Sequence, residues 1–586
     1  MIKEAIYHRA DSHMSYLTDD GDLVITIKAK KGDLEKVVLI YDDRYDSKPP
    51  SPPVRLSLPF LMSDELYDYF GLKFTCKYTR MSYYFSLLDH DGNHSYFYQD
   101  GFSQDYSWGR QRLFQFPYLH SIDTPHVPKW LKSAVMYQIF PDSFANGKDS
   151  IEEKPTRHVL DNGVMVESRL GGTIGGIIDN IPYLKSLGVN LLYLNPIFTA
   201  NSYHKYDTVD YFKVDPCLGT EDDFKRLVDE CHANGIKIML DIVFNQSSNQ
   251  FFAFQDILKN GKKSPYADWY KIHDFPVQGG DRPNYETFGF YETMPKFNTD
   301  NKEVEDYLIK VGSYWIKEFD IDGYRIDVAN EVSHNFWRKF RYEMDKLKKD
   351  FALIGELWHD SHSFIGGDQF HSVQNFPLMY AIWEFFAFDS INAHQFVERI
   401  NRLAMTYPLD NTQAMMNFID CHDVGRFLTM AKCSYERQRL SAAFIFTYIG
   451  MPSIYYGDEK AMEGDDINDS RRKMIWQDGQ ESKAMLDFYK ALIRIRKDHH
   501  QLQTGSYRPL VAQVDENVFG YYRGGAEDQV ICVFNNCDKA NSMSIEATSD
   551  CETYIDLLSG SEYMAKEREL NLDMDPYTCL ILKERP

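Results

Sequence analysis

Four apolar segments that each carry an acidic residue near their carboxyl end constrain the fold of this chain more than any other feature. The acids are Asp241 in IKIMLDIVFN, Asp327 in GYRIDVANE, Glu356 in ALIGELWHD and Asp423 in NFIDCHDVGRF. In a parallel β/α barrel the carboxyl ends of the strands meet on one face, where the active sites of such barrels lie. A single acid at a strand end could cap the next helix, whereas four in chain order predict one shared site.

Arg325 and Asp327 lie two residues apart in GYRID, so on a strand both side chains point to the same face. An arginine beside a carboxylate favours the charged form and lowers the pKa of the carboxyl group, as a nucleophilic aspartate requires. Gly323 in the same run permits close packing or an unusual backbone angle. The alternative is a buried structural ion pair, because such pairs also perturb pKa values. This motif alone leaves both interpretations open.

The hydrophobic pattern predicts an α/β fold with three domains. Residues 1–122 show short alternating apolar runs, which are typical of an antiparallel β-sandwich. Residues 123–502 alternate apolar strands with amphipathic helices, such as those expected at 177–188 and 221–235, and this pattern predicts a (β/α)8 TIM barrel. Residues 503–586 return to short alternating runs, and we expect a second β-sandwich there.

The charge balance argues against a nucleic-acid partner. The 586 residues carry 87 acidic and 64 basic side chains, a formal net charge of −23, whereas nucleic-acid binding needs basic stripes. No apolar run is long enough to span a membrane, and the first residues lack the apolar core of a secretory signal. The nine cysteines show neither zinc-site nor disulfide spacing. We therefore expect a cytoplasmic protein with reduced thiols.

Seven motifs follow one another along the chain: GGTIGGI, DIVFN, MPKFN, GYRIDVANE, GELWHD, FIDCHD and GMPSIYYGDE. In this order they resemble the α-amylase family of retaining glycoside hydrolases, and most closely its cyclomaltodextrinase, neopullulanase and maltogenic amylase group. The resemblance implies a small excursion domain at residues 246–301, after the third barrel strand. It also implies a starch-binding-type N-terminal domain that forms a homodimer and covers the partner subunit's active site.

The resemblance assigns the chemistry to three acids. Asp327 is expected to be the nucleophile that forms a covalent glycosyl-enzyme, and Glu356 the acid that protonates the leaving oxygen and then activates water. Apolar neighbours of Glu356 such as Leu357 and Trp358 are expected to keep it protonated. Asp423 is expected to hold sugar hydroxyls and to aid ring distortion. Retention predicts that the two main carboxyl groups lie roughly 5 to 5.5 Å apart.

The substrate contacts implied by the same resemblance are more numerous. They are Tyr45, Tyr206, Asp241, Gln246, Phe288, Arg325, Glu331, Trp358, His422 and Arg426. Tyr206 is expected to stack under the reacting sugar, and Phe288 and Trp358 to stack sugars on the leaving-group side. Core packing is the alternative for Phe288 and Trp358, and an ordinary surface position is the alternative for Tyr45, the candidate lid residue.

Two positions depart from the family pattern. Gln246 stands where the family usually has a histidine that donates to the hydroxymethyl group of the reacting sugar, so we expect altered affinity or specificity. Lys148 and Thr173 stand where relatives have oxygen-rich or anionic calcium ligands, and Ca²⁺ needs six to eight oxygens. We expect no metal at that position, or the lysine ammonium in place of the ion, and no cofactor.

The function expected from the resemblance is retaining hydrolysis of α-1,4-glucosidic bonds in cyclodextrins, maltooligosaccharides and pullulan. Cleavage of α-1,6 bonds and transglycosylation are left open. One alternative is an α-glucosidase or glucanotransferase of the same family. The other is a catalytically silent sugar-binding homologue.

Overall fold

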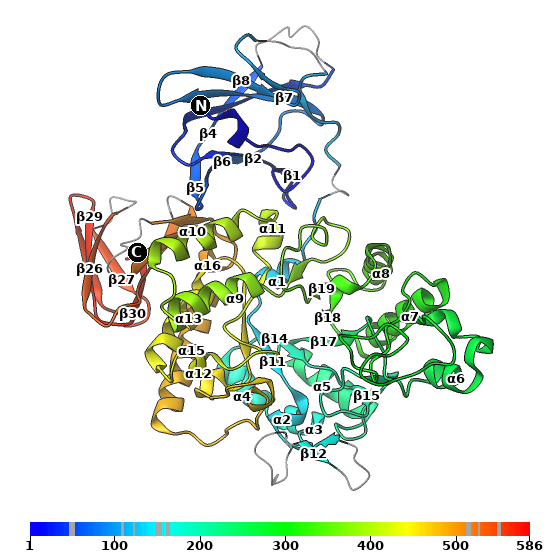
Figure 1. The fold of residues 1–586 in the computed structure, drawn as a ribbon. Coiled ribbons are helices and arrows are strands. Elements are labelled where there is room, and N and C mark those ends of the chain that lie inside the picture. The colour runs from blue at the N-terminus through cyan, green and yellow to red at the C-terminus, as the bar shows by residue number, and fades with distance from the viewer. Residues whose placement is uncertain are drawn as a thin grey trace.

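The computed structural model describes residues 1–45, 53–106, 111–120, 124–146, 155, 157–159, 165–510, 517–525, 528–547 and 552–585. The predicted limit between residues 122 and 123 falls outside these ranges. Figure 1 shows an N-terminal β domain above a central α/β domain, with a C-terminal β domain at the side of the latter.

Eight parallel strands form the central barrel in the order β20-β19-β18-β17-β14-β11-β22-β21. Their bounds are β11 (Met136–Ile139), β14 (Leu191–Leu194), β17 (Lys237–Val243), β18 (Gly323–Asp327), β19 (Ala352–Gly355), β20 (Ser372–Val373), β21 (Met416–Asn417) and β22 (Met451–Tyr455). A parallel bridge between Gln374 and Met416 joins the two ends of this order. The predicted TIM barrel is confirmed.

Alternate residues of these strands point into the barrel or toward the helices. Leu191 and Met239 belong to an inner apolar cluster, whereas Leu192 and Leu240 belong to the larger cluster under the helices. Gly323 lies where the interior is too narrow for a side chain, because a Cβ there would meet the Ala352 carbonyl oxygen at 2.8 Å. The close packing predicted for this glycine is therefore present.

Helices cover the outside of the barrel. Helix α5 (Glu221–Ala233) lies where the sequence predicts it and begins with a capping box between Thr220 and Asp223. The helix expected over 177–188 is instead two helices, α3 (Ile174–Asp179) and α4 (Ile181–Leu187). Pro182 lies in the first turn of α4 and cannot donate a helical hydrogen bond, which explains the break at Asn180. The other outer helices are α7 (Lys302–Phe319), α8 (His334–Leu347), α9 (Phe376–Ile382), α10 (Ala393–Ala404), α13 (Tyr435–Thr447) and α15 (Gln480–Asp498).

The excursion between β17 and α7 contains α6 (Phe252–Asn260) and two short 3-10 turns, and the rest of it is irregular. It packs on the rest of the domain through Phe251 and Phe297, which both contact the ring of Tyr211, and Phe251 also contacts Tyr307 of α7. Figure 1 shows it projecting from the barrel beside α7. The small excursion after the third barrel strand is thus present as predicted.

The N-terminal domain consists of two antiparallel sheets. One has the order β1-β2-β6-β5 and the other β4-β3-β7-β8-β9, with β10 paired to β7. The bounds are β1 (Ser15–Leu17), β2 (Leu23–Lys30), β3 (Leu34–Asp43), β4 (Val54–Leu58), β5 (Phe60–Ser63), β6 (Tyr67–Phe74), β7 (Met81–Asp89), β8 (His94–Tyr98), β9 (Gly101–Ser103) and β10 (Phe114–Phe116). A shared apolar core that includes Ile25 and Phe85 fills the space between the sheets.

The C-terminal domain is an antiparallel sheet with the strand order β23-β24-β25-β30-β27-β28-β29-β26. The bounds are β23 (Tyr507–Pro509), β24 (Val518–Gly525), β25 (Asp528–Asn535), β26 (Asn541–Glu546), β27 (Thr553–Asp556), β28 (Glu562–Lys566), β29 (Glu569–Met574) and β30 (Thr578–Glu584). Phe519 and Phe534 join the apolar cluster of the barrel, whereas Val518 and Val533 form a core within the domain. One face therefore anchors this domain to the barrel.

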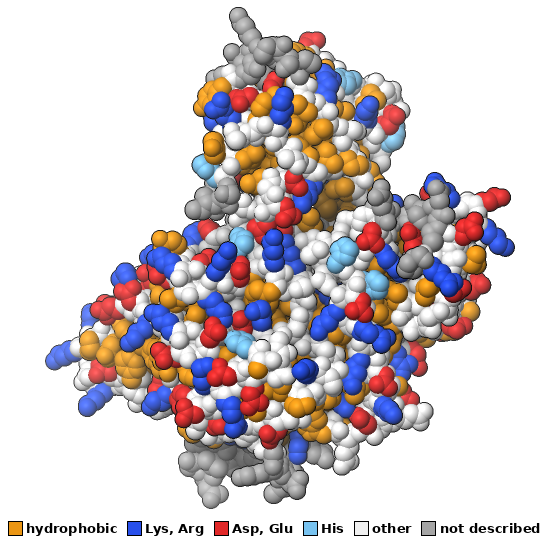
Figure 2. All heavy atoms as spheres, turned by 180° about the vertical axis from the view of Figure 1, so that it is seen from behind, with side chains coloured by type: hydrophobic (Ala, Val, Ile, Leu, Met, Phe, Trp, Pro, Cys, Tyr) orange, Lys and Arg blue, Asp and Glu red, His pale blue; other side chains and the backbone are white. Residues whose placement is uncertain are grey.

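The described surface carries both signs of charge. On the face drawn in Figure 2, acidic and basic side chains are interspersed over the barrel. Among the described residues, no helix is long and apolar enough to cross a membrane.

Candidate functional site

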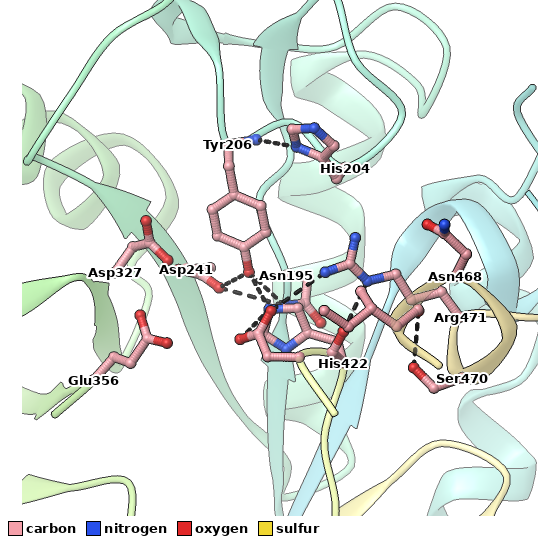
Figure 3. A network of polar contacts seen from close by, with 12 residues as sticks. Asn195, His204, Tyr206, Asp241, Asp327, Glu356, His422, Asn468, Ser470 and Arg471 are labelled. Carbon is pink, nitrogen blue, oxygen red and sulfur yellow. Dashed lines mark hydrogen bonds and ion pairs between the residues drawn. The ribbon is translucent and has the colours of Figure 1, made fainter. Parts of the chain in front are cut away.

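Neighbouring barrel strands bring Asp327 and Glu356 together at their carboxyl ends. Asp327 is the last residue of β18, and Glu356 follows directly after β19. The two strands pair in parallel with Ile326 opposite Gly355. Both acids are buried, with 7% and 6% of their surface exposed. In Figure 3 their carboxylates lie beside each other, across from Tyr206 and His422.

The guanidinium group of Arg325 links the acids. Its Nη1 atom lies 2.9 Å from Asp327 Oδ1 and 2.9 Å from Asp241 Oδ1. Its Nη2 atom lies 3.0 Å from Glu356 Oε2 and 3.8 Å from Asp423 Oδ2. The predicted common face of Arg325 and Asp327 is therefore present, and all four acids singled out from the strand ends surround one buried cation.

The pKa of Asp327 moves in the direction opposite to the one predicted from the sequence. Burial raises this pKa well above its usual value, the Glu356 carboxylate raises it further, and Arg325 offsets only part of the increase. The prediction was wrong because it considered Arg325 without the burial and without the second carboxylate. The carboxyl group of Asp327 therefore holds its proton more strongly than a free aspartate does.

The backbone after Asp327 is strained. Val328 adopts φ 43° and ψ 46°, a left-handed conformation that a β-branched residue rarely takes. This turn directs the Val328 N–H to Glu356 Oε2, which accepts it at 2.9 Å. Strain of this kind gathers at functional sites because the surrounding structure enforces it.

Tyr206, His422 and Asp423 form the opposite wall. The Tyr206 hydroxyl lies 2.5 Å from His422 Nε2, and the two rings are stacked with centroids 5.6 Å apart. His422 Nε2 also lies 3.1 Å from Asp423 Oδ2, and its Nδ1 lies 2.7 Å from Gln138 Nε2. Burial and the positive charges of Arg471 and Arg325 lower the pKa of His422 well below its usual value. A neutral His422 that accepts from Gln138 at Nδ1 can donate from Nε2 to the Tyr206 hydroxyl.

Asp241 lies beneath this wall and is fully buried. Its Oδ2 atom accepts hydrogen bonds from the hydroxyls of Tyr193 at 2.7 Å and Tyr206 at 2.8 Å. Burial raises the pKa of Asp241, and Arg325 offsets part of that increase. In this structure the contacts of Asp241 position Tyr206 and Arg325.

Comparisons with known proteins agree with this geometry. Residues 138–502 match the family model of the alpha amylase catalytic domain, and residues 1–120 match that of the alpha amylase N-terminal ig-like domain. The chain belongs to the α-amylase family. It is therefore a glycoside hydrolase, and the resemblance drawn from the seven motifs is confirmed.

Individual members of the family match over the whole chain. The chain is 40% identical to "Neopullulanase 2" of Thermoactinomyces vulgaris, with 99% of each chain covered. It is 39% identical to a "Cyclomaltodextrinase" of Thermoanaerobacter pseudethanolicus, with 100% of each covered. A solved structure titled "Cyclomaltodextrinase" matches with a TM-score of 0.94 at 34% identity and covers 100% of both chains.

Gln246, which departs from the usual family histidine, lies next to the Tyr206 segment. Its Nε2 atom donates to the Tyr206 carbonyl oxygen at 3.3 Å, and only 1% of the residue is exposed. Its Oε1 atom is buried and has no hydrogen-bond partner within the described residues. The amide thus offers an unused acceptor, which an imidazole would not present in the same place.

The two predicted stacking aromatics differ in their surroundings. Trp358 is 37% exposed, and one face of its indole stacks on Phe376 with centroids 3.9 Å apart. The indole Nε1 donates to Glu356 Oε1 at 2.9 Å. Trp358 therefore lies over Glu356 and is also hydrogen-bonded to it. Phe288 lies in the excursion, half-buried, and stacks with the exposed Tyr291.

Three other predicted contacts lie apart from the central group. Glu331 is bonded to Lys296 at 2.8 Å and stays partly exposed. Tyr45 is 53% exposed on the N-terminal domain, and Arg80 lies over its ring. Arg426 is fully buried, with its guanidinium 3.2 Å from Asp458 and over the ring of Tyr455. These contacts give Arg426 a structural role in this structure and do not bring it to Asp327.

The sequence patterns missed several polar residues of the site. Arg471 donates from Nε to the His422 carbonyl oxygen and contacts Asp423 Oδ1 at 3.3 Å through Nη2. Gln138 and Asn195 bond to each other at 2.9 Å behind His422. Gln138 is a polar residue inside an otherwise apolar strand, and that departure was the signal that could have revealed it. Arg471 carries no such signal, because it reaches the site from a loop far along the chain.

Two side chains near the position where the resemblance implied a calcium site already have hydrogen-bond partners. Thr173 accepts from the Gly176 N–H as the N-cap of α3. Asp142 accepts from the backbone N–H groups of Leu170 and Gly171. Lys148 lies outside the described residues. Among the described residues, the group close enough to share an ion is Cys421, His422 and Asp423, and it belongs to the site described above.

Proposed function

We propose that this enzyme hydrolyses α-1,4-glucosidic bonds in cyclodextrins, short maltooligosaccharides and pullulan with retention of configuration, and that α-1,6 bonds are also within its range. The observation that carries the proposal is the contact of Asp327 and Glu356 with the two terminal nitrogens of one buried guanidinium. The names of the relatives, neopullulanase and cyclomaltodextrinase, support the choice of substrates.

The proposed reaction has two steps. Asp327 attacks the anomeric carbon while Glu356 passes its proton to the glycosidic oxygen, so the C–O bond breaks and the leaving sugar departs as an alcohol. Water then adds to the anomeric carbon as Glu356 takes a proton from it, and the bond to Asp327 breaks. Arg325 keeps Asp327 oriented through both steps, since it contacts Oδ1 at 2.9 Å.

The remaining residues bind the sugar. Tyr206 offers its ring, His422 its Nε2–H and Asp423 its carboxylate to the reacting unit, and their mutual hydrogen bonds hold them ready for it. Trp358 and Phe288 accept sugars on the leaving-group side. We infer that Glu331, which accepts from Lys296 at 2.8 Å, influences whether water or a second sugar attacks the intermediate.

The assembly and location form a further part of the proposal. We infer a homodimer through the N-terminal domain, in which the partly exposed Tyr45 reaches the partner's cleft. We also infer a cytoplasmic enzyme, which is supported by 36% identity to an "Intracellular maltogenic amylase" of Bacillus subtilis. The same proposal includes the domain limits, which are 1–122, 123–502 and 503–586. It also includes independence of the enzyme from calcium.

The assembly has a direct test. Light scattering after size-exclusion chromatography is expected to give twice the mass of 68.5 kDa. Tyr45→Ala is expected to leave this mass unchanged and to raise the rate on soluble starch relative to β-cyclodextrin, because the cleft becomes wider. A monomeric mass would exclude the dimer, and an unchanged substrate ratio would exclude Tyr45 as a lid.

The catalytic assignment is tested with Asp327→Asn. We expect kcat on β-cyclodextrin and maltotriose to fall by about 10⁴-fold or more, because no covalent intermediate can form. The melting temperature is expected to stay the same or to rise, since a neutral amide relieves the crowding of buried acids around Arg325. Substantial residual hydrolysis would refute Asp327 as the nucleophile. Wild-type protein that cleaves none of these substrates would refute the proposed function.

A further inference from the structure

The carboxyl group of Glu356 has two oxygens with different surroundings. Oε2 accepts from the Val328 backbone N–H at 2.9 Å and lies 3.0 Å from the Arg325 guanidinium. Oε1 accepts from the Trp358 indole Nε1 at 2.9 Å. One oxygen thus faces a cation and a backbone donor, and the other faces one neutral donor.

These surroundings decide which oxygen can carry the acid's proton. A proton on Oε2 would point toward groups that only donate, because neither a guanidinium nor an amide N–H accepts a hydrogen bond. A hydroxyl at Oε1 can still accept the indole N–H with a lone pair while its own hydrogen points elsewhere. The indole then fixes the plane of the carboxyl group around the oxygen that must face the glycosidic bond.

The indole itself is held in place. Its ring is nearly parallel to Phe376, at an interplanar angle of 13°, and Phe376 is fully buried at the start of α9. The other ring face remains open, since 37% of Trp358 is exposed. The edge that donates to Glu356 and the face open to a sugar are therefore separate parts of one ring.

We propose that Trp358 is a positioning residue for catalysis: its indole N–H orients Oε1 of Glu356, the oxygen that delivers the proton to the leaving group. This inference deepens the proposed function and rests on it. It adds to sugar stacking a second role, which depends on the N–H group and not on the ring face.

The test compares two substrates of the Trp358→Phe variant, which keeps an aromatic face against Phe376 and removes the N–H. Maltotriose needs a proton on its leaving oxygen, whereas fluoride leaves α-maltosyl fluoride with little help from an acid. The quantity measured is kcat/KM, which reports the steps up to the glycosyl-enzyme. General acid catalysis contributes about 10²- to 10⁴-fold, so we expect the loss on maltotriose to exceed the loss on the fluoride by at least about tenfold.

Two further variants keep the result interpretable. Trp130→Phe removes an indole N–H that donates to the Asp350 carbonyl oxygen at 2.9 Å. Asp350 precedes β19, whereas Glu356 follows it, so this contact lies at the opposite end of the strand. Trp130→Phe is expected to leave both rates unchanged. Phe376→Leu keeps the indole N–H but removes the ring on which the indole stacks. We expect its loss of kcat/KM to be larger on maltotriose than on the fluoride as well, but by a smaller factor than in Trp358→Phe.

Equal losses of kcat/KM on both substrates in Trp358→Phe would overturn the proposal and leave sugar stacking as the role of Trp358. Unchanged kcat/KM on both would overturn it as well. If Trp358→Phe does not fold, Phe376→Leu decides, and an equal effect on both substrates there rejects the proposal. Failure of the proposed function is distinguishable, because the wild type would then cleave neither substrate.

Discussion

At the scale of single residues, the site is governed by one buried cation among four carboxylates. Arg325 lies within 3.0 Å of Asp241, Asp327 and Glu356 and 3.8 Å from Asp423. Four acids around one arginine cannot all be ionised at low energetic cost in a buried place, and the raised pKa of Asp327 reflects this.

Gln246 gives a prediction at the same scale. Gln246→His removes the buried Oε1 acceptor and the donation to the Tyr206 carbonyl oxygen. We expect the ratio of kcat/KM between β-cyclodextrin and maltotriose to change by about 2- to 10-fold, the size of one hydrogen bond, mainly through KM. Steady-state kinetics on a series of maltooligosaccharides provides the measurement. Identical kinetics on every member of the series would show that Gln246 does not influence specificity.

At the scale of elements, loops fastened by local contacts hold the site residues. Tyr206 follows Lys205, whose ammonium lies 2.8 Å from the buried Asp215, and Asp215 also accepts from the Ala200 N–H. This internal ion pair anchors the segment that carries Tyr206. Thr173, at the position where the resemblance implied a calcium ligand, accepts from the Gly176 N–H as the N-cap of α3.

A chelation experiment follows from this arrangement. We expect EDTA to leave the melting temperature and the rate on β-cyclodextrin unchanged, because Thr173 and Asp142 already accept hydrogen bonds from backbone N–H groups. Differential scanning calorimetry with and without EDTA, followed by addition of Ca²⁺, checks this. A large drop in melting temperature that Ca²⁺ restores would contradict the proposed independence from calcium.

At the scale of the whole molecule, the N-terminal domain rests on the barrel through polar contacts. His13 Nδ1 lies 2.7 Å from Nε2 of His362, which belongs to the loop after Glu356. Elsewhere along this boundary Lys31 lies 2.7 Å from Glu398, and the Tyr16 hydroxyl accepts from the Leu409 N–H. The position of this domain is thus linked to the loop that carries Trp358.

His13 makes this boundary sensitive to pH. Burial and the neighbouring His362 lower the pKa of His13 from 6.5 to about 4; Lys28 and Arg9 add smaller decreases, and Asp360 offsets a small part of the lowering. Between these values the unfolded chain binds more protons, so the free energy of unfolding decreases as the pH falls from about 6.5 to about 4. We expect the melting temperature to fall over this range less steeply in His13→Gln than in the wild type. Equal slopes in calorimetry at a series of pH values would show that His13 does not contribute.

The sequence by itself determined the barrel, the strand ends and the common face of Arg325 and Asp327. These follow from local rules. The two-residue repeat of a strand fixes the face to which each side chain points, and the parallel order of the strands fixes the face of the barrel on which their carboxyl ends meet. The exception among the helices is the break at Asn180, which Pro182 explains.

Only the tertiary structure decided what depends on distant partners. Burial and a carboxylate 29 residues away reverse the pKa shift expected for Asp327. Arg471 reaches Asp423 from another loop, and the Trp358 indole is aimed at Glu356 by its stacking on Phe376. Electrostatic energy and hydrogen-bond geometry depend on distances through space, which spacing along the chain does not encode.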